Sequence, residues 1–300
     1  MAYRIKQGES LQQATERIAT EQIEKALDEL SDPDLSRPKV VHQIRKRCKK
    51  LRGLVRLVRP ASEAVYQTEN EWFRDTARML SSARDAKVMQ DTYDLLMDHF
   101  GDQVDRQSFA PIRGKLTRRR QELIEQELDT DDIFRQATER LQEAKERISD
   151  WCFCGQDASI AAAGACKTYG RARDAWKELD EDSPPEDYHE LRKRTKYHMY
   201  HCRLLRPLWR LEMEAREEVA DKLGDHLGDD HDLAVLRTTI DQMKGIEGKT
   251  RKTFIQLIDQ RRRKLEKKSR ESAARLFGAE KTKAFEKRIA AMYRLWLAND

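Results

Sequence analysis

The segment VHQIRKRCKKLRGLVRLVRP at residues 41–60 returns as YHELRKRTKYHMYHCRLLRP at residues 188–207. The two segments lie 147 residues apart, and His, Arg, Lys, Arg, Lys, Leu, Arg and Pro recur at matching places. Pro60 and Pro207 end both segments, and proline cannot continue a helical hydrogen-bond ladder. The repeated segment is therefore expected to be a helix, present twice.

The same offset, without a gap, aligns LSSARDAKVM at 80–89 with LGDDHDLAVL at 227–236. It also aligns Gly101 with Gly248, which suit helix C-terminal caps. Two separated matches in one register indicate an internal duplication, which fixes the architecture. We expect one domain over residues 1–300 with repeats at 10–150 and 157–297.

Composition favours an all-α chain. Charged residues make up 38% of the sequence and apolar residues another 38%, with only 12 glycines and 7 prolines. Such a chain forms long helices with many surface ion pairs, and short connections predict antiparallel neighbours in two bundles related by a pseudo-twofold. The expected helices cover 9–30, 38–59, 62–80, 83–100, 105–128, 131–150, 157–179, 186–206, 210–225, 230–244, 249–277 and 279–297.

The cysteines and the apolar residues bear on location. Five cysteines, an odd number in a long chain, do not fit the disulfide framework of a small secreted domain, so reduced thiols are expected. The N-terminal residues carry no apolar signal segment, and no run of about 18 apolar residues could span a bilayer. These features predict a cytoplasmic protein without a membrane partner.

Basic residues gather on one side of the first repeated helix. At 100° per residue, Ile44, Cys48, Leu51 and Val55 form a buried stripe. The segment 41–60 has no acidic residue, and like charges at this spacing repel by a few tenths of a kcal/mol per pair. An anionic ligand is therefore expected to compensate the charge of an adjoining arc, which contains His42, Arg45, Lys46, Lys49, Arg52 and Arg56.

The second copy keeps the same design with Glu190 as its only acid. Its arc contains His189, Arg192, Lys193, Lys196 and Arg203. If a pseudo-twofold relates the two helices, the arcs meet in one basic central groove. Lys167, Arg171 and Arg173 share another helix and are expected to extend this surface, although single basic residues of this kind are more often plain solvated surface.

His42 and His189 lie in the first turns of helices crowded with cations. The helix dipole and these cations disfavour the imidazolium form, so each ring is expected to be neutral and to donate an N–H to an anion. Free backbone N–H groups at a helix N-terminus also suit phosphate oxygens. The alternative for both residues is a capping or packing role.

The stretch GDHLGDDHDL at 224–233 invites a metal-site interpretation because it contains His231 and Asp232. The repeat argues against it, since Arg84 and Asp85 occupy the corresponding places and arginine does not ligate metals. A better interpretation has His231 and Arg84 facing the anion, with no metal and no cofactor. His198 aligns with the apolar Leu51, which favours core packing.

No phosphate-binding glycine loop, nucleophile elbow or zinc-protease motif is present, so no catalytic residue is assigned. The motifs that are present resemble the conserved histidine α-helical domain family, CHAD, over about residues 10–297. They are the two basic helices, each followed by a segment that begins with a leucine. The first of these segments contains Leu80, Arg84, Asp85 and Val88. The second contains Leu227, Gly228, His231, Asp232 and Val235. The first has Ser81 where the second has Gly228.

The resemblance implies a pair of helical bundles that bind inorganic polyphosphate in a basic central groove, and association with polyphosphate granules. It implies a stand-alone binding module and not an enzyme. Two alternatives stay open. One is nucleic-acid binding without sequence specificity, which the charge supports but which lacks interleaved aromatic residues. The other is a metal-dependent phosphohydrolase that uses His231 and Asp232.

Overall fold

The computed structural model describes residues 3–80, 82–126 and 130–298, without the side chains of 82–86, 123–126 and 130–131. These residues form helices and no strand, which confirms the all-α class. The α-helices are α1 (Leu11–Ser31), α2 (Arg37–Leu57), α3 (Glu63–Met79), α4 (Ser82–Phe100), α5 (Ala110–Gln126), α6 (Thr130–Glu146), α7 (Asp157–Lys177), α8 (Pro185–Leu204), α9 (Arg210–Gln242), α10 (Gly248–Ala273) and α11 (Thr282–Ala298).

The ends of the helices follow local sequence signals. Ser10 and Gln13 form a reciprocal capping box at the start of α1. The repeated helices α2 and α8 both end three residues before the proline of their segment. Gly101, directly after α4, has φ of +49°, a conformation that glycine adopts without strain. Gly248, expected to cap a helix, instead begins α10.

Helix α9 is continuous over 33 residues, so the expected break between 225 and 230 was wrong. The alignment of the halves predicted that break, because the matching residues of the first half lie between the expected helices 62–80 and 83–100. Gly224 and Gly228 are buried within the continuous helix, where they make room for side chains of α8. A Cβ on Gly224 would lie 2.6 Å from Cε of Lys196, and one on Gly228 would lie 3.2 Å from a guanidinium nitrogen of Arg192. Close packing thus explains why glycines lie within this helix.

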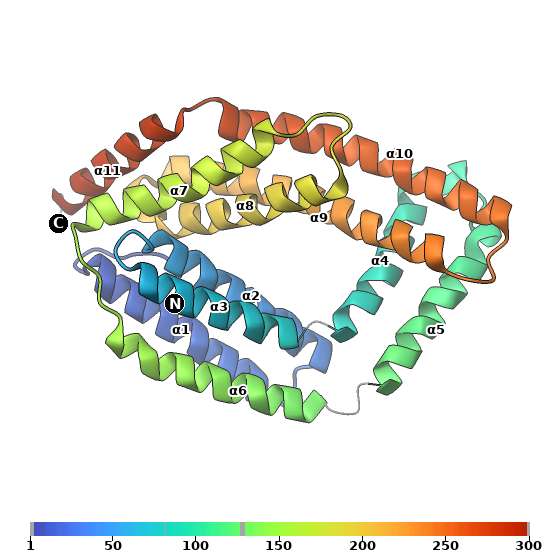
Figure 1. Ribbon diagram of the computed structural model, residues 1–300, viewed down its shortest axis with the longest axis horizontal. Coiled ribbons are helices and arrows are strands. Elements are labelled where there is room, and N and C mark those ends of the chain that lie inside the picture. The colour runs from blue at the N-terminus through green and yellow to red at the C-terminus, as the bar shows by residue number, and fades with distance from the viewer. Residues whose placement is uncertain (1–2, 81, 127–129, 299–300) are drawn as a thin grey trace.

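Two hydrophobic cores hold the chain together. The larger core joins α1, α2, α3 and α6 to α7, α8, α11 and the N-terminal half of α9. The smaller core joins α4 and α5 to the C-terminal half of α9 and to α10. In Figure 1 the smaller core lies at the end of the molecule where α4 and α5 meet α9 and α10. The cores do not follow the two halves of the sequence, because each takes helices from both.

Helices α2 and α8 pack against each other at Gly53 and Tyr200, where a Cβ on the glycine would lie 3.1 Å from the tyrosine Cβ. Beside this contact, Nε2 of the buried His201 lies 2.9 Å from the carbonyl oxygen of Gly53. Residues 53 and 200 are 147 apart, the offset of the repeat. A twofold relation between the halves would bring such equivalent positions together. The duplication itself stays a prediction.

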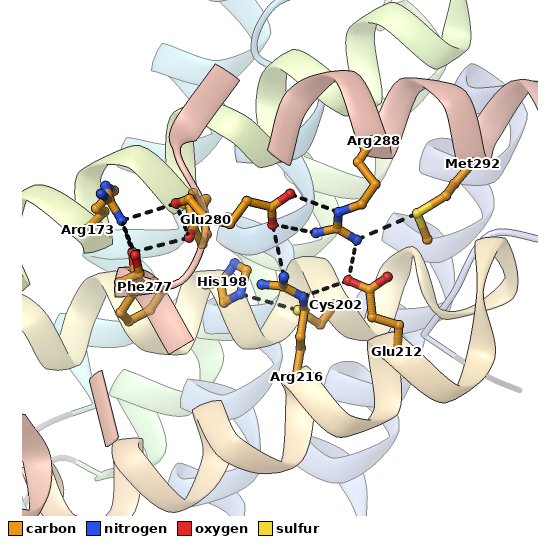
Figure 2. Close-up of polar contacts among 11 residues, drawn as sticks. Arg173, His198, Cys202, Glu212, Arg216, Phe277, Glu280, Arg288 and Met292 are labelled. Carbon is orange, nitrogen blue, oxygen red and sulfur yellow. Dashed lines mark hydrogen bonds and ion pairs between the residues drawn. The ribbon is translucent and has the colours of Figure 1, made fainter. Parts of the chain in front are cut away.

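An ion-pair network fastens α11 to α9, as Figure 2 shows. Arg216 on α9 lies between Glu212, at 2.8 Å, and Glu280, at 3.0 Å. Arg288 on α11 pairs with the same two carboxylates. Because charges alternate around the network, each group has opposite-charge neighbours.

Among the described helices, none combines the length and the apolar character that a bilayer crossing requires. The five cysteines are free thiols.

Candidate anion-binding site

The basic arc of α2 runs along the side of the helix that faces α3. Arg45, Arg52 and Arg56 are half-buried, and Lys49 is exposed. Arg45 donates to the backbone carbonyl of Ala77, at 3.4 Å. These four residues are spaced as one helix face, and the row from residue 45 to residue 56 is about 16 Å long at 1.5 Å per residue. The sequence placed this row correctly.

Arg56 is a half-buried cation of the arc. Its described hydrogen bonds go to neutral acceptors, the side-chain oxygen of Asn70 and the backbone carbonyl of Arg52, and its Nε is buried without a partner. The guanidinium carbon lies 3.9 Å from the centre of the Tyr197 ring. Burial lowers the pKa of Arg56, and the positive charges of Arg52 and Arg194 act in the same direction. A half-buried guanidinium in this environment is stabilised by an arriving anion.

Three helices surround Arg56 and form a hollow that opens to solvent. Helix α7 comes close to the end of α2 because Gly164 has no side chain, so that a Cβ there would lie only 1.8 Å from the carbonyl oxygen of Leu57. Helix α8 packs beside both. We call this site the Arg56 hollow. Its lining residues are Arg56, Arg59, Lys167, Thr168, Arg171, Arg194 and Tyr197.

The Arg56 hollow is strongly positive. Five of its seven lining residues are cations and none is acidic. Two of the five cations pair with carboxylates that do not line the hollow, Arg59 with Glu63 and Arg194 with Glu190. Arginine forks, a lysine and a hydroxyl donor converge there, which is the donor set that phosphate oxygens accept.

Sequence reasoning found part of the Arg56 hollow and missed the rest. Lys167 and Arg171 were expected to extend the basic surface because they share one helix. Four lining residues lie outside the predicted arcs and become neighbours only when α2, α7 and α8 pack. They are Arg59, Thr168, Arg194 and Tyr197. Tyr197 also corrects the expectation that the basic surface lacks interleaved aromatic residues.

Arg173 does not reach the hollow, contrary to expectation. Its guanidinium donates to the backbone carbonyls of Phe277, Gly278 and Glu280, as Figure 2 shows. These carbonyls lie at the π-helical turn Ala274–Gly278 and just beyond it. Arg173 therefore stabilises the connection to α11.

Much of the α8 arc is already paired within the protein. Lys196 contacts Asp221 at 3.1 Å and Asp225 at 3.4 Å. Arg203 donates to Glu217 at 2.7 Å, and Lys193 pairs with Glu190. The expectation of an equally basic face in both halves is therefore corrected. Glu190 lies on α8 itself, whereas Glu217, Asp221 and Asp225 come from α9, a neighbour that the α8 sequence does not reveal.

The histidine pair lies at the start of α8. The rings of His189 and His231 have centroids 4.3 Å apart, and Arg192 lies beside them over Gly228. Burial lowers the pKa of His189 to about 4, with His231, Lys193 and Arg192 adding to the effect. Burial and Arg192 also lower the pKa of His231. Both rings are therefore neutral near pH 7, as expected for His189.

The remaining predicted residues lie at the other end of α2. His42 and Lys46 are exposed on its N-terminal half. Arg84 belongs to α4, but its side chain lies outside the described residues. His42 and Lys46 extend the basic row of α2 away from the Arg56 hollow.

The stretch at 224–233 is mostly engaged in other contacts. Asp230 is 1% exposed and pairs with Arg262 at 2.9 Å. The His231 ring lies against the His189 ring at an angle of 33°. Within the part of the chain that the structure describes, no three His, Cys, Asp or Glu side chains come together as a metal-binding group. His198 is 1% exposed, and Figure 2 shows it beside Cys202; the predicted core position is confirmed.

Comparison with known proteins agrees with this architecture. The family model described as CHAD domain matches residues 17–241. The crystal structure of the CHAD domain from the plant Ricinus communis is similar, with a TM-score of 0.57 and 13% sequence identity, covering 94% of this chain and 96% of that chain. At such low identity the likeness concerns the fold alone. No curated protein sequence gives a significant match.

Proposed function

The chain belongs to the CHAD domain family, and from this membership and the geometry of the Arg56 hollow we propose that it binds inorganic polyphosphate and does not act on it chemically. The observation that carries the proposal is the hollow itself, where five cations and no acid converge. The half-buried Arg56 has neutral hydrogen-bond partners and would gain a charged one.

The chemistry of the lining residues suits a chain of phosphates. Arginine can hold two phosphate oxygens at once, whereas lysine acts as a point charge. The row of Arg45, Lys49 and Arg52 continues from the hollow along α2, so that one linear polyanion could contact both. Each neutralised phosphate releases counterions, which makes binding strongly salt-dependent.

The proposal includes a cellular setting. A protein that binds polyphosphate through an exposed basic surface would associate with polyphosphate granules in the cytoplasm. It needs no cofactor for this role, and it acts as a module that attaches to the polymer.

Nucleic acid is the main competing ligand because it offers the same row of phosphates. The Arg56 guanidinium covers one face of the Tyr197 ring, at 3.9 Å from its centre, which leaves less of that ring for stacking on a base. We therefore expect polyphosphate to bind more tightly than an oligonucleotide at equal phosphate concentration.

The test is a titration of the full chain with polyphosphate of defined length at two salt concentrations, with single-stranded and duplex oligonucleotides as comparators. The variant Lys167→Ala/Arg171→Ala removes two exposed cations of the hollow. It should weaken binding about tenfold and reduce the salt dependence by about one to two phosphate contacts.

The matched control is Arg210→Ala/Lys222→Ala, which removes two exposed cations of α9 outside the hollow. The control should bind like the original chain. Equal weakening of polyphosphate binding in both double variants would assign binding to net charge and refute the Arg56 hollow as the site. Tighter binding of oligonucleotides than of polyphosphate would refute polyphosphate as the ligand. Phosphate release that requires a divalent metal and is lost in His231→Ala would refute the non-catalytic role.

A further inference from the structure

The two motif helices face residues of different charge at equivalent positions of their neighbouring helices. On α2, Arg52 and Arg56 both bond to the side-chain oxygen of Asn70 on α3. On α8, Arg203 bonds to Glu217 on α9. In each half an arginine near the end of the motif helix thus contacts the residue 14 positions later, and residues 70 and 217 are separated by the repeat offset of 147. An amide in one half corresponds to a carboxylate in the other.

The difference extends along the same two helices. Lys196 on α8 lies between Asp221 and Asp225. The residues 147 positions before these aspartates are Arg74 and Arg78 on α3. Glu217, Asp221 and Asp225 therefore form an acidic row on α9, which we call the α9 acidic row. The corresponding positions of α3 carry one amide and two arginines.

The α9 acidic row competes with any external anion. Glu217 is only 8% exposed and also binds Arg206, so one carboxylate neutralises two guanidinium groups. An anion that approached Arg203 would have to displace a buried carboxylate that is already in place and has no association entropy to lose. At Asn70 the anion meets a neutral oxygen, and it gains the full attraction of Arg52 and Arg56.

We propose that the charge of these facing residues determines where the polyanion binds. Asn70 keeps the α2 side open to phosphate, whereas the α9 acidic row closes the α8 side. The chain then has one polyphosphate track, on α2 and the Arg56 hollow, in place of two equal tracks around a symmetric groove. This inference rests on the proposed function, because it concerns which half of the same basic surface takes the ligand.

The first test changes Asn70→Asp, a nearly isosteric substitution that adds one negative charge between Arg52 and Arg56. Polyphosphate affinity should fall about tenfold, since the new carboxylate occupies the guanidinium groups that the ligand would use. Denaturant unfolding should show that the variant is at least as stable as the original chain, which excludes misfolding as the cause. The control Gln103→Glu adds the same charge at an exposed position in the smaller-core end of the molecule.

The second test opens the closed side with Asp221→Asn/Asp225→Asn, two side chains that are 52% and 71% exposed. Because the substitutions remove the two carboxylates that pair with Lys196, this lysine becomes available to phosphate. Polyphosphate affinity should therefore rise several-fold, and the salt dependence should increase by about one phosphate contact. The control Asp102→Asn/Asp241→Asn removes two exposed acids near the smaller core and should have less effect.

The outcomes separate this inference from the proposed function. If the original chain does not bind polyphosphate, the proposed function fails. If it binds, the inference fails and the proposed function stands in either of two cases. The first is that Asn70→Asp and Gln103→Glu have the same polyphosphate affinity. The second is that Asp221→Asn/Asp225→Asn has the same polyphosphate affinity as its control.

Discussion

His201 is a neutral, fully buried histidine where α2 packs against α8. Its Nε2 lies 2.9 Å from the Gly53 carbonyl oxygen, so that nitrogen carries the proton and donates. Burial lowers the pKa of His201 to about 4, the Gly53 hydrogen bond opposes this shift, and nearby Arg56 adds to it. Because the folded pKa lies below the unfolded value of about 6.5, the stabilisation is complete above pH 6.5 and is lost as the pH falls toward 4.

We predict that His201→Gln makes the chain less sensitive to acid. Glutamine can keep a donor to Gly53 but does not titrate. Between pH 7 and pH 5 the original chain should lose about 2 kcal/mol more unfolding free energy than the variant. Urea unfolding at the two pH values measures this difference, in which the contributions of His189 and His198 cancel. Equal losses in both proteins would contradict the assigned protonation of His201.

At single residues, the sequence predicted the cations better than their partners. The spacing of Arg45, Arg52 and Arg56 on an acid-free helix was enough to place them on one face. Nothing in that segment shows that Asn70 faces two of them, or that Glu217 faces Arg203. Such pairs depend on which helix packs alongside, a tertiary property that helical periodicity does not contain.

Helices α9 and α11 are joined by alternating charges and not only by apolar contact. Arg288 reaches both Glu212 and Glu280 (Figure 2), and its side chain is 25% exposed. Removing one member of such a network leaves carboxylates that share the remaining Arg216.

We predict that Arg288→Ala destabilises the fold by about 2 kcal/mol, a value below that of a fully buried pair because water screens part of the interaction. The control is Arg294→Ala, also on α11 but exposed, which should change stability by less than about 0.5 kcal/mol. Denaturant unfolding of both variants makes the comparison. Equal, small effects would show that apolar packing alone holds α11 in place.

Most helices could be predicted within a few residues of their ends, whereas α9 could not. The alignment of the halves predicted a break at 225–230, because the matching residues of the first half lie between the expected helices 62–80 and 83–100. The folded chain keeps one helix there, and Gly224 and Gly228 within it are sites of close approach for Lys196 and Arg192. The alignment alone does not show that α9 continues where the first half has two helices.

At the scale of the whole molecule, neither half of the sequence contains a complete core. The smaller core combines residues 89–116 with residues 233–265, and the larger core likewise draws on both halves. The sequence predicted two bundles, but the exchange of helices between halves depends on long-range packing that a repeat alone does not specify.

We predict that the fragments 3–150 and 157–298 do not fold separately. Each would expose apolar surface that the other covers, so neither should show a cooperative unfolding transition. Mixing the two should restore helical circular dichroism and one cooperative transition. Cooperative unfolding of either fragment alone would show that one half contains a sufficient core.

The sharing of both cores also has a consequence for synthesis of the chain. A ribosome releases the N-terminal helices first, and domains usually fold in that order. Here the smaller core cannot be completed before Leu265 is synthesised, nor the larger core before Tyr293. The nascent protein must therefore remain incompletely folded until these residues have left the ribosome, and until then its apolar helix faces are available to chaperones at the ribosome exit.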